Sequence, residues 1–180
     1  MGFAQDYWKD FEELSIDLIK LLFKDYHFDK HIEKTQSNKD GGYDGVVLIS
    51  DDKHNVYKAI SESKLRKLSR KDLPLSDFAK TLIISVNLCA DKVYIFTNLH
   101  FSNETQNRIE KFSRGTNIKV QLFDIVEIVG LIPKLADDIL KNYPTEFIEK
   151  LQNSVTDHPR KLSLNPAPKI NLKKECELLG

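Results

Sequence analysis

The chain has 180 residues, of which 41% are hydrophobic and 30% charged, and this size and composition suit one folded domain with a short appendage. The formal net charge is zero, which excludes a protein held to nucleic acid or membrane by bulk charge. No apolar run approaches the roughly 18 residues that a membrane span needs, and the charged opening segment does not resemble a signal peptide. We therefore expect a cytoplasmic protein with no membrane partner, in which Cys89 and Cys176 are free thiols.

The first third of the chain predicts one helix followed by a β-hairpin. Apolar residues at spacings of three and four indicate an amphipathic helix over residues 5–24. A short strand over residues 31–36 leads into a polar, glycine-rich turn over residues 37–42. The Val-Val-Leu-Ile run at residues 46–49 is typical of a strand covered on both faces. After a polar loop, residues 56–64 are expected to return as its antiparallel partner.

The middle of the chain is harder to assign. A basic, irregular stretch over residues 65–74 precedes an expected helix over residues 76–88. Ser76 is its expected N-cap, and its apolar face is formed by Phe78, Leu82, Val86 and Cys89. The segment from residue 81 to residue 86 would also suit a strand.

The remaining elements alternate strand and helix before the chain becomes purely helical. We expect a strand over residues 92–97, a helix over residues 102–113 that Ser102 caps and Gly115 stops, and a strand over residues 117–123. From Asp124 the pattern is helical to about residue 155, with Pro144 opening the last helix.

The candidate chemistry lies in the predicted hairpin. Side chains alternate along a strand, so Glu62 and Lys64 share one face, and the antiparallel return brings Asp44, at the start of the first strand, beside them. Two converging carboxylates repel each other unless a cation compensates. Mg²⁺ favours carboxylates, carbonyl oxygens and water, so the predicted ligands are Asp44, Glu62 and the carbonyl of Ser63. Lys64 would then assist an attack on a phosphodiester.

Glu12 is an additional candidate ligand. A helical projection at about 100° per residue places Glu12 inside the apolar arc of the first helix, where an acid needs a partner. We expect it to reach the metal directly or through water. A solvated carboxylate at the edge of the helix is the alternative.

Several of these segments together resemble a known family. Phe11-Glu12-Glu13-Leu14, Asp40-Gly41-Gly42-Tyr43-Asp44, Glu62-Ser63-Lys64 and Ile95-Phe96-Thr97 occur in the order typical of the Mrr-type branch of the PD-(D/E)xK restriction endonuclease-like superfamily. The resemblance spans roughly residues 5 to 130. Tyr43 stands where the superfamily name has proline, and Glu62 stands where many members of the branch have Gln.

The resemblance implies an α/β fold, with a restriction endonuclease-like core in which helices flank a mixed β-sheet. It implies a Mg²⁺-dependent DNA endonuclease, with Mn²⁺ as the alternative metal. In it Asp44 and Glu62 bind the metal, Lys64 is catalytic and Glu12 is auxiliary. Restriction or antiphage defence is the expected role, and fusion to an NTPase or sensor module is common in such proteins.

The expected boundaries follow from this reading. The nuclease core covers residues 1–132, a small helical extension covers residues 133–157, and residues 158–180 form a proline- and lysine-rich linker or tail. We expect the tail to lead to a further domain, so that the chain is the amino-terminal piece of a longer protein. Two cuts in a duplex need two sites, so a homodimer or higher oligomer is also expected.

The basic run and the acidic residues each have a simpler interpretation. Five cations close to the site could bind the DNA backbone or be solvated loop residues: Lys64, Arg66, Lys67, Arg70 and Lys71. The acidic residues with Lys64 could form an ordinary ion pair at a sheet edge. Two functional alternatives also remain, a structure-selective nuclease resembling Holliday-junction resolvases and a nuclease-like fold that only binds nucleic acid or a partner.

Overall fold

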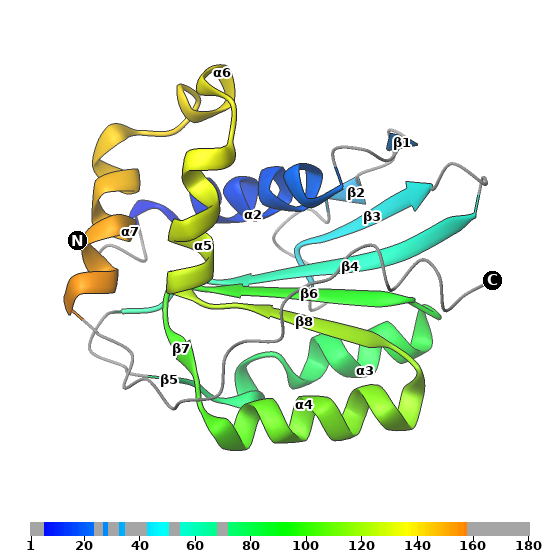
Figure 1. The fold of residues 1–180 in the computed structure, drawn as a ribbon. Helices are drawn as coiled ribbons and strands as arrows, with labels where there is room; N and C mark the ends of the chain where they lie inside the picture. Colours follow the sequence, from blue (N-terminus) through cyan, green and yellow to red (C-terminus); the bar gives the residue numbers. More distant parts are fainter. Residues whose placement is uncertain are drawn as a thin grey trace.

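A mixed sheet with helices on both faces forms the centre of the computed structural model (Figure 1). The structure describes residues 6–23, 27–28, 33–34, 43–50, 55–67 and 72–157. The α/β class and the helix-flanked mixed sheet expected from the sequence are therefore confirmed. Within the described residues, no helix combines the length and the apolar character that crossing a membrane requires.

Four longer strands form the sheet in the order β3-β4-β6-β8. They are β3 (Gly45–Ser50), β4 (Val56–Lys64), β6 (Lys92–Thr97) and β8 (Lys119–Phe123). β3 is antiparallel to β4, and β6 and β8 run parallel to β4. Consequently β4, β6 and β8 all end at the same edge of the sheet, where β3 begins.

Four short strands complete the sheets. β1 (His27–Phe28) and β2 (Glu33–Lys34) pair antiparallel with β3. β5 (Asp72–Leu73) and β7 (His100–Phe101) form a separate parallel pair. Only β2 falls within a predicted strand, because two residues are too few to carry a periodic pattern. The predicted glycine-rich turn over residues 37–42 lies outside the described residues.

One face of the sheet is covered by the first helix and the C-terminal helices. They are α2 (Trp8–Leu22), α5 (Ile125–Leu131), the short η2 (Ile132–Lys134) and α6 (Asp137–Leu140), and α7 (Thr145–Asp157). Phe11 of α2, Phe96 of β6 and Phe147 of α7 belong to the same buried cluster. The expected helical extension therefore packs into the same core as the first helix, and residues 158–180 lie outside the described residues.

Helices α3 (Ala79–Asn87) and α4 (Asn103–Thr116) cover the opposite face, and the short η1 (Leu75–Asp77) precedes α3. Ile60 of β4, Ile95 of β6 and Ile109 of α4 pack in this second cluster. The side chain of Ser102 accepts a hydrogen bond from the Thr105 amide, which confirms the predicted N-cap of α4.

Three details of the helix predictions are wrong. Ser76 lies in η1, and α3 begins after Phe78 without a side-chain cap. Val86 is 46% exposed and Cys89 is exposed, because α3 turns Thr81, Leu82 and Ser85 toward the sheet instead. α4 continues through Gly115 and is followed by the left-handed Asn117, with φ of 59°.

Candidate active site

The start of β3 and the end of β4 lie side by side at the edge where the parallel strands end. Gly45 is opposite Ser61 in the antiparallel register. One residue earlier, the amide of Asp44 donates a hydrogen bond to the carbonyl oxygen of Ser61 at 2.9 Å. The hairpin therefore places Asp44 beside Glu62, as the antiparallel pairing predicts.

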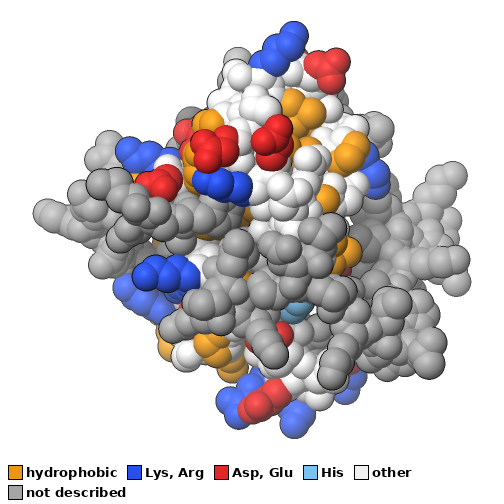
Figure 2. Space-filling model, turned by 90° about the vertical axis from the view of Figure 1, so that its left-hand side faces the viewer, with side chains coloured by type: hydrophobic (Ala, Val, Ile, Leu, Met, Phe, Trp, Pro, Cys, Tyr) orange, Lys and Arg blue, Asp and Glu red, His pale blue; other side chains and the backbone are white. Residues whose placement is uncertain are grey.

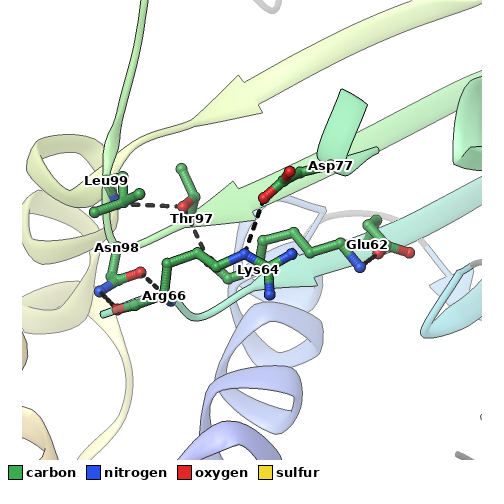
Figure 3. A network of polar contacts seen from close by, with 7 residues as sticks. All are labelled: Glu62, Lys64, Arg66, Asp77, Thr97, Asn98 and Leu99. Atoms are coloured by element: carbon green, nitrogen blue, oxygen red, sulfur yellow. Dashed lines mark hydrogen bonds and ion pairs between the residues drawn. The ribbon is translucent and has the colours of Figure 1, made fainter. Parts of the chain in front are cut away.

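Glu62 and Lys64 project from the same face of β4. Ile60 packs in the cluster beneath α3 and α4, whereas Ala59 packs in the cluster beneath α2. Alternation along the strand places Glu62 and Lys64 on the side of Ile60. Lys64 Nζ pairs with Glu62 Oε1, and Figure 3 shows the lysine side chain extended along β4 toward the carboxylate.

Glu62 is a deeply buried carboxylate. It is 2% exposed, its Oε2 atom is fully buried, and hydrogen bonds from the side chains of Lys64 and Thr81 act on the carboxylate. Burial raises the pKa of Glu62 to about 7; the nearby charge of Asp44 acts in the same direction, and Lys64 opposes both. The ion pair with Lys64 therefore compensates only part of the cost of burying this charge.

Asp44 is fixed by the residue between Glu62 and Lys64. Its Oδ2 atom accepts hydrogen bonds from the amide and the hydroxyl of Ser63, each at 2.5 Å. Burial raises the pKa of Asp44, whereas these two hydrogen bonds and the charge of Lys64 lower it. The side chain of Ser63 thus orients Asp44, a role that the sequence did not indicate because alternation points Ser63 away from Glu62.

The donor set at this edge is suited to a hard divalent cation. Two carboxylates that repel each other, one of them almost completely buried, are stabilised by a positive ion between them. No group of three or more His, Cys, Asp or Glu side chains that could hold a metal occurs among the described residues. Further ligands would have to be main-chain oxygens, such as the predicted carbonyl of Ser63, or water.

The predicted role of Glu12 stays a prediction. Glu12 is half-buried on α2, which covers the face of the sheet opposite to α3. The structure brings Asp44, Glu62 and Lys64 together, and it does not add Glu12 to them as a third acidic ligand.

The basic run after β4 is only partly described. Arg66 Nε pairs with Asp77 Oδ2 at 2.9 Å, Lys67 is exposed, and Arg70 and Lys71 lie outside the described residues. Figure 2 shows the molecule from the side where β4, β6 and β8 end, and in its described part acidic and basic side chains are interspersed.

Two buried polar residues at the end of β6 join this site. Thr97 and Asn98 are 0% and 1% exposed, and both form hydrogen bonds with the chain segment Lys64–Arg66 (Figure 3). The sequence signal for these residues is a pair of polar residues at the end of a largely apolar strand.

Comparison with known proteins gives no identification: no family model and no curated protein matches the chain.

Proposed function

We propose that this protein is a Mg²⁺-dependent endonuclease that hydrolyses DNA phosphodiester bonds, with Asp44, Glu62 and Lys64 as its site. The observation that carries the proposal is the convergence of these three side chains at one edge of the sheet, two of them on adjacent positions of one face of β4. The order of the motifs along the chain and the mixed sheet support a restriction endonuclease-like fold of the Mrr type.

Each residue has a role that its position supports. Asp44, oriented by Ser63, and Glu62, with its buried Oε2, would hold the cation. When bound, Mg²⁺ neutralises charge on a phosphodiester and lowers the pKa of a bound water. The ammonium of Lys64 lies beside Glu62, a proposed metal ligand, and so would lie close to a phosphodiester bound at the metal. There Lys64 would stabilise the negative charge that develops on the phosphoryl oxygens. Arg66 and Lys67 would contact the DNA backbone without reading its sequence.

An ordinary ion pair at a sheet edge explains this arrangement less well. Ion pairs on a protein surface are solvated and have little effect on stability. Here the acid is 2% exposed and a second acid lies nearby, an arrangement that lowers stability unless a ligand binds. Buried acids with a second charged group nearby are typical of sites that bind cations or carry out catalysis.

The direct test is incubation of supercoiled plasmid with the protein, with Mg²⁺ or with EDTA, followed by gel electrophoresis. We expect nicked or linear product only with Mg²⁺, and loss of cutting in Lys64→Ala, Asp44→Ala and Glu62→Ala. Lys111→Ala, which removes an exposed lysine from the far side of α4, is the matched control and should cut normally. Mg²⁺-dependent cutting by all three site variants at the wild-type rate would refute the proposal.

A further inference from the structure

The residue after Leu65 is held by a side chain from the neighbouring strand. Asn98 Oδ1 accepts a hydrogen bond from the Arg66 amide at 2.8 Å, and Asn98 Nδ2 donates one to the Arg66 carbonyl at 2.8 Å. The Asn98 side chain thus binds both the amide and the carbonyl of Arg66, as the main chain of a neighbouring strand would. β4 has already ended at Lys64, so this pairing extends the order of the sheet by two residues.

The main chain of Lys64 is held by Thr97, the residue before Asn98. Thr97 Oγ1 donates a hydrogen bond to the Lys64 carbonyl at 2.9 Å and accepts one from the Leu99 amide at 3.2 Å. Thr97 lies opposite Lys64 in the parallel register of β4 and β6. The main chain of the proposed catalytic lysine is therefore bonded to a hydroxyl that is itself fixed on both sides.

The Arg66 side chain is fixed by a third residue. Its Nε atom donates a hydrogen bond to Asp77 Oδ2 at 2.9 Å. Asp77 belongs to η1, which directly follows β5, and β5 pairs with β7 immediately after Leu99. Figure 3 shows the Arg66 side chain extending from beside Asn98 toward Asp77, and the Lys64 side chain extending toward Glu62. Asn98 and Asp77, which both bind Arg66, thus lie next to β7 and β5, the two strands of the small second sheet.

We propose that Thr97 and Asn98 are positioning residues that fix the end of β4, so that Lys64 faces the phosphodiester to be cut and Arg66 meets a neighbouring backbone phosphate. This inference rests on the proposed function. Neither residue touches substrate; they act by holding the main chain from which the two cations project. A side chain misplaced by about 1 Å can lower a rate by on the order of 100-fold, so fixing this segment has a direct effect on catalysis.

The chain contains a closely matched control for Thr97. Thr116 Oγ1, at the end of α4, donates to the Phe112 carbonyl at 2.9 Å and accepts from the Ile118 amide at 3.3 Å. Thr97→Val and Thr116→Val therefore remove the same two kinds of hydrogen bond, one at the site and one away from it. Thr97→Ser keeps the hydroxyl and serves as the conservative variant.

The experiment measures Mg²⁺-dependent plasmid cutting by the full chain, with kcat and KM determined separately, for these variants and for Lys64→Ala. We expect Thr97→Val to lower kcat by about 10- to 100-fold, with Thr97→Ser and Thr116→Val close to wild type. We expect Asn98→Ala to raise KM as well, because Arg66 loses its main-chain anchor. It should also speed hydrogen exchange of the Arg66 amide at least about 10-fold, since that amide loses its acceptor.

The outcomes separate the two proposals. If Lys64→Ala abolishes cutting but Thr97→Val changes kcat no more than Thr116→Val does, the positioning role is overturned and the proposed function stands. If the wild-type protein shows no Mg²⁺-dependent cutting, the proposed function fails and the positioning role fails with it. Unchanged exchange of the Arg66 amide in Asn98→Ala would overturn the part of the inference that concerns Asn98.

Discussion

Replacing Glu62 with glutamine should change the pH dependence of stability in the metal-free protein. Glu62 is almost completely buried, and burial together with the charge of Asp44 raises its pKa from 4.5 to about 7 in the folded state. In the unfolded chain the group keeps a pKa near its ordinary value. Between these two values the folded protein binds the additional proton, so the free energy of unfolding falls as pH rises.

The size of the effect follows from the two pKa values. A tenfold difference in proton affinity corresponds to about 1.4 kcal/mol, so a shift from 4.5 to about 7 corresponds to about 3 kcal/mol. The contribution of neutral Glu62 is fully present below pH 4.5 and is lost as pH rises through 7, mostly between pH 5 and 8. Glutamine has no charge to bury, so Glu62→Gln should lack this loss.

Urea denaturation in EDTA at several pH values from 5 to 8 measures the difference. Relative to Glu62→Gln, the wild type should lose about 2 to 3 kcal/mol across this range. Glu104→Gln is the control, because Glu104 is exposed on α4 and pairs only with Arg108 in the described ion pairs. A stability difference between wild type and Glu62→Gln that stays constant with pH would refute the assignment of a raised pKa to Glu62.

Three further predictions concern the hydrogen bonds of Asp44, the end of α3 and the contact between the helical extension and α2. Ser63→Ala removes one of the two hydrogen bonds to Asp44 Oδ2 and should weaken Mg²⁺ binding about 10-fold, measured as the Mg²⁺ concentration for half-maximal cutting; an unchanged value would contradict the orienting role. Cys89→Gly should raise stability by about 0.5 to 1 kcal/mol in thermal denaturation, because Cys89 follows α3 with φ of 49°, and a loss of stability would contradict this. Tyr143→Phe removes the 2.7 Å hydrogen bond to Asp17 that joins the helical extension to α2, and denaturation should show a loss of about 1 kcal/mol; no loss would mean that this bond does not contribute.

The hairpin that carries the site could be predicted because its information is local. β4 occupies residues 56–64 as expected, and β3 exceeds the predicted run by one residue at each end. An apolar run, a polar loop and a second strand determine the pairing, and alternation then determines which side chains share a face. The same reasoning placed Glu62 and Lys64 together and brought Asp44 beside them.

The contacts of Thr97 and Asn98 could not be predicted because they depend on a parallel register. β6 pairs with β4 only after a connection that contains α3, and no local pattern sets Lys64 opposite Thr97. The face of α3 was misassigned for a related reason. Ser85 can be buried because its hydroxyl bonds to the carbonyl of Leu82, so a polar residue occupies the inner face and Val86 turns outward.

The burial of Glu62 itself is an argument about function. Folding does not require a carboxylate at that position, since glutamine has the same shape and would avoid a cost of about 3 kcal/mol above pH 7. Hydrogen bonds from Lys64 and Thr81 offset only part of this cost, because the pKa of Glu62 still rises to about 7. Glu62 is buried at a cost in stability, next to a second acid and a lysine, and a ligand that binds the carboxylate explains why it is there. A divalent cation bound there would return the lost stability, so added Mg²⁺ should stabilise the wild type at pH 8 and leave Glu62→Gln nearly unchanged.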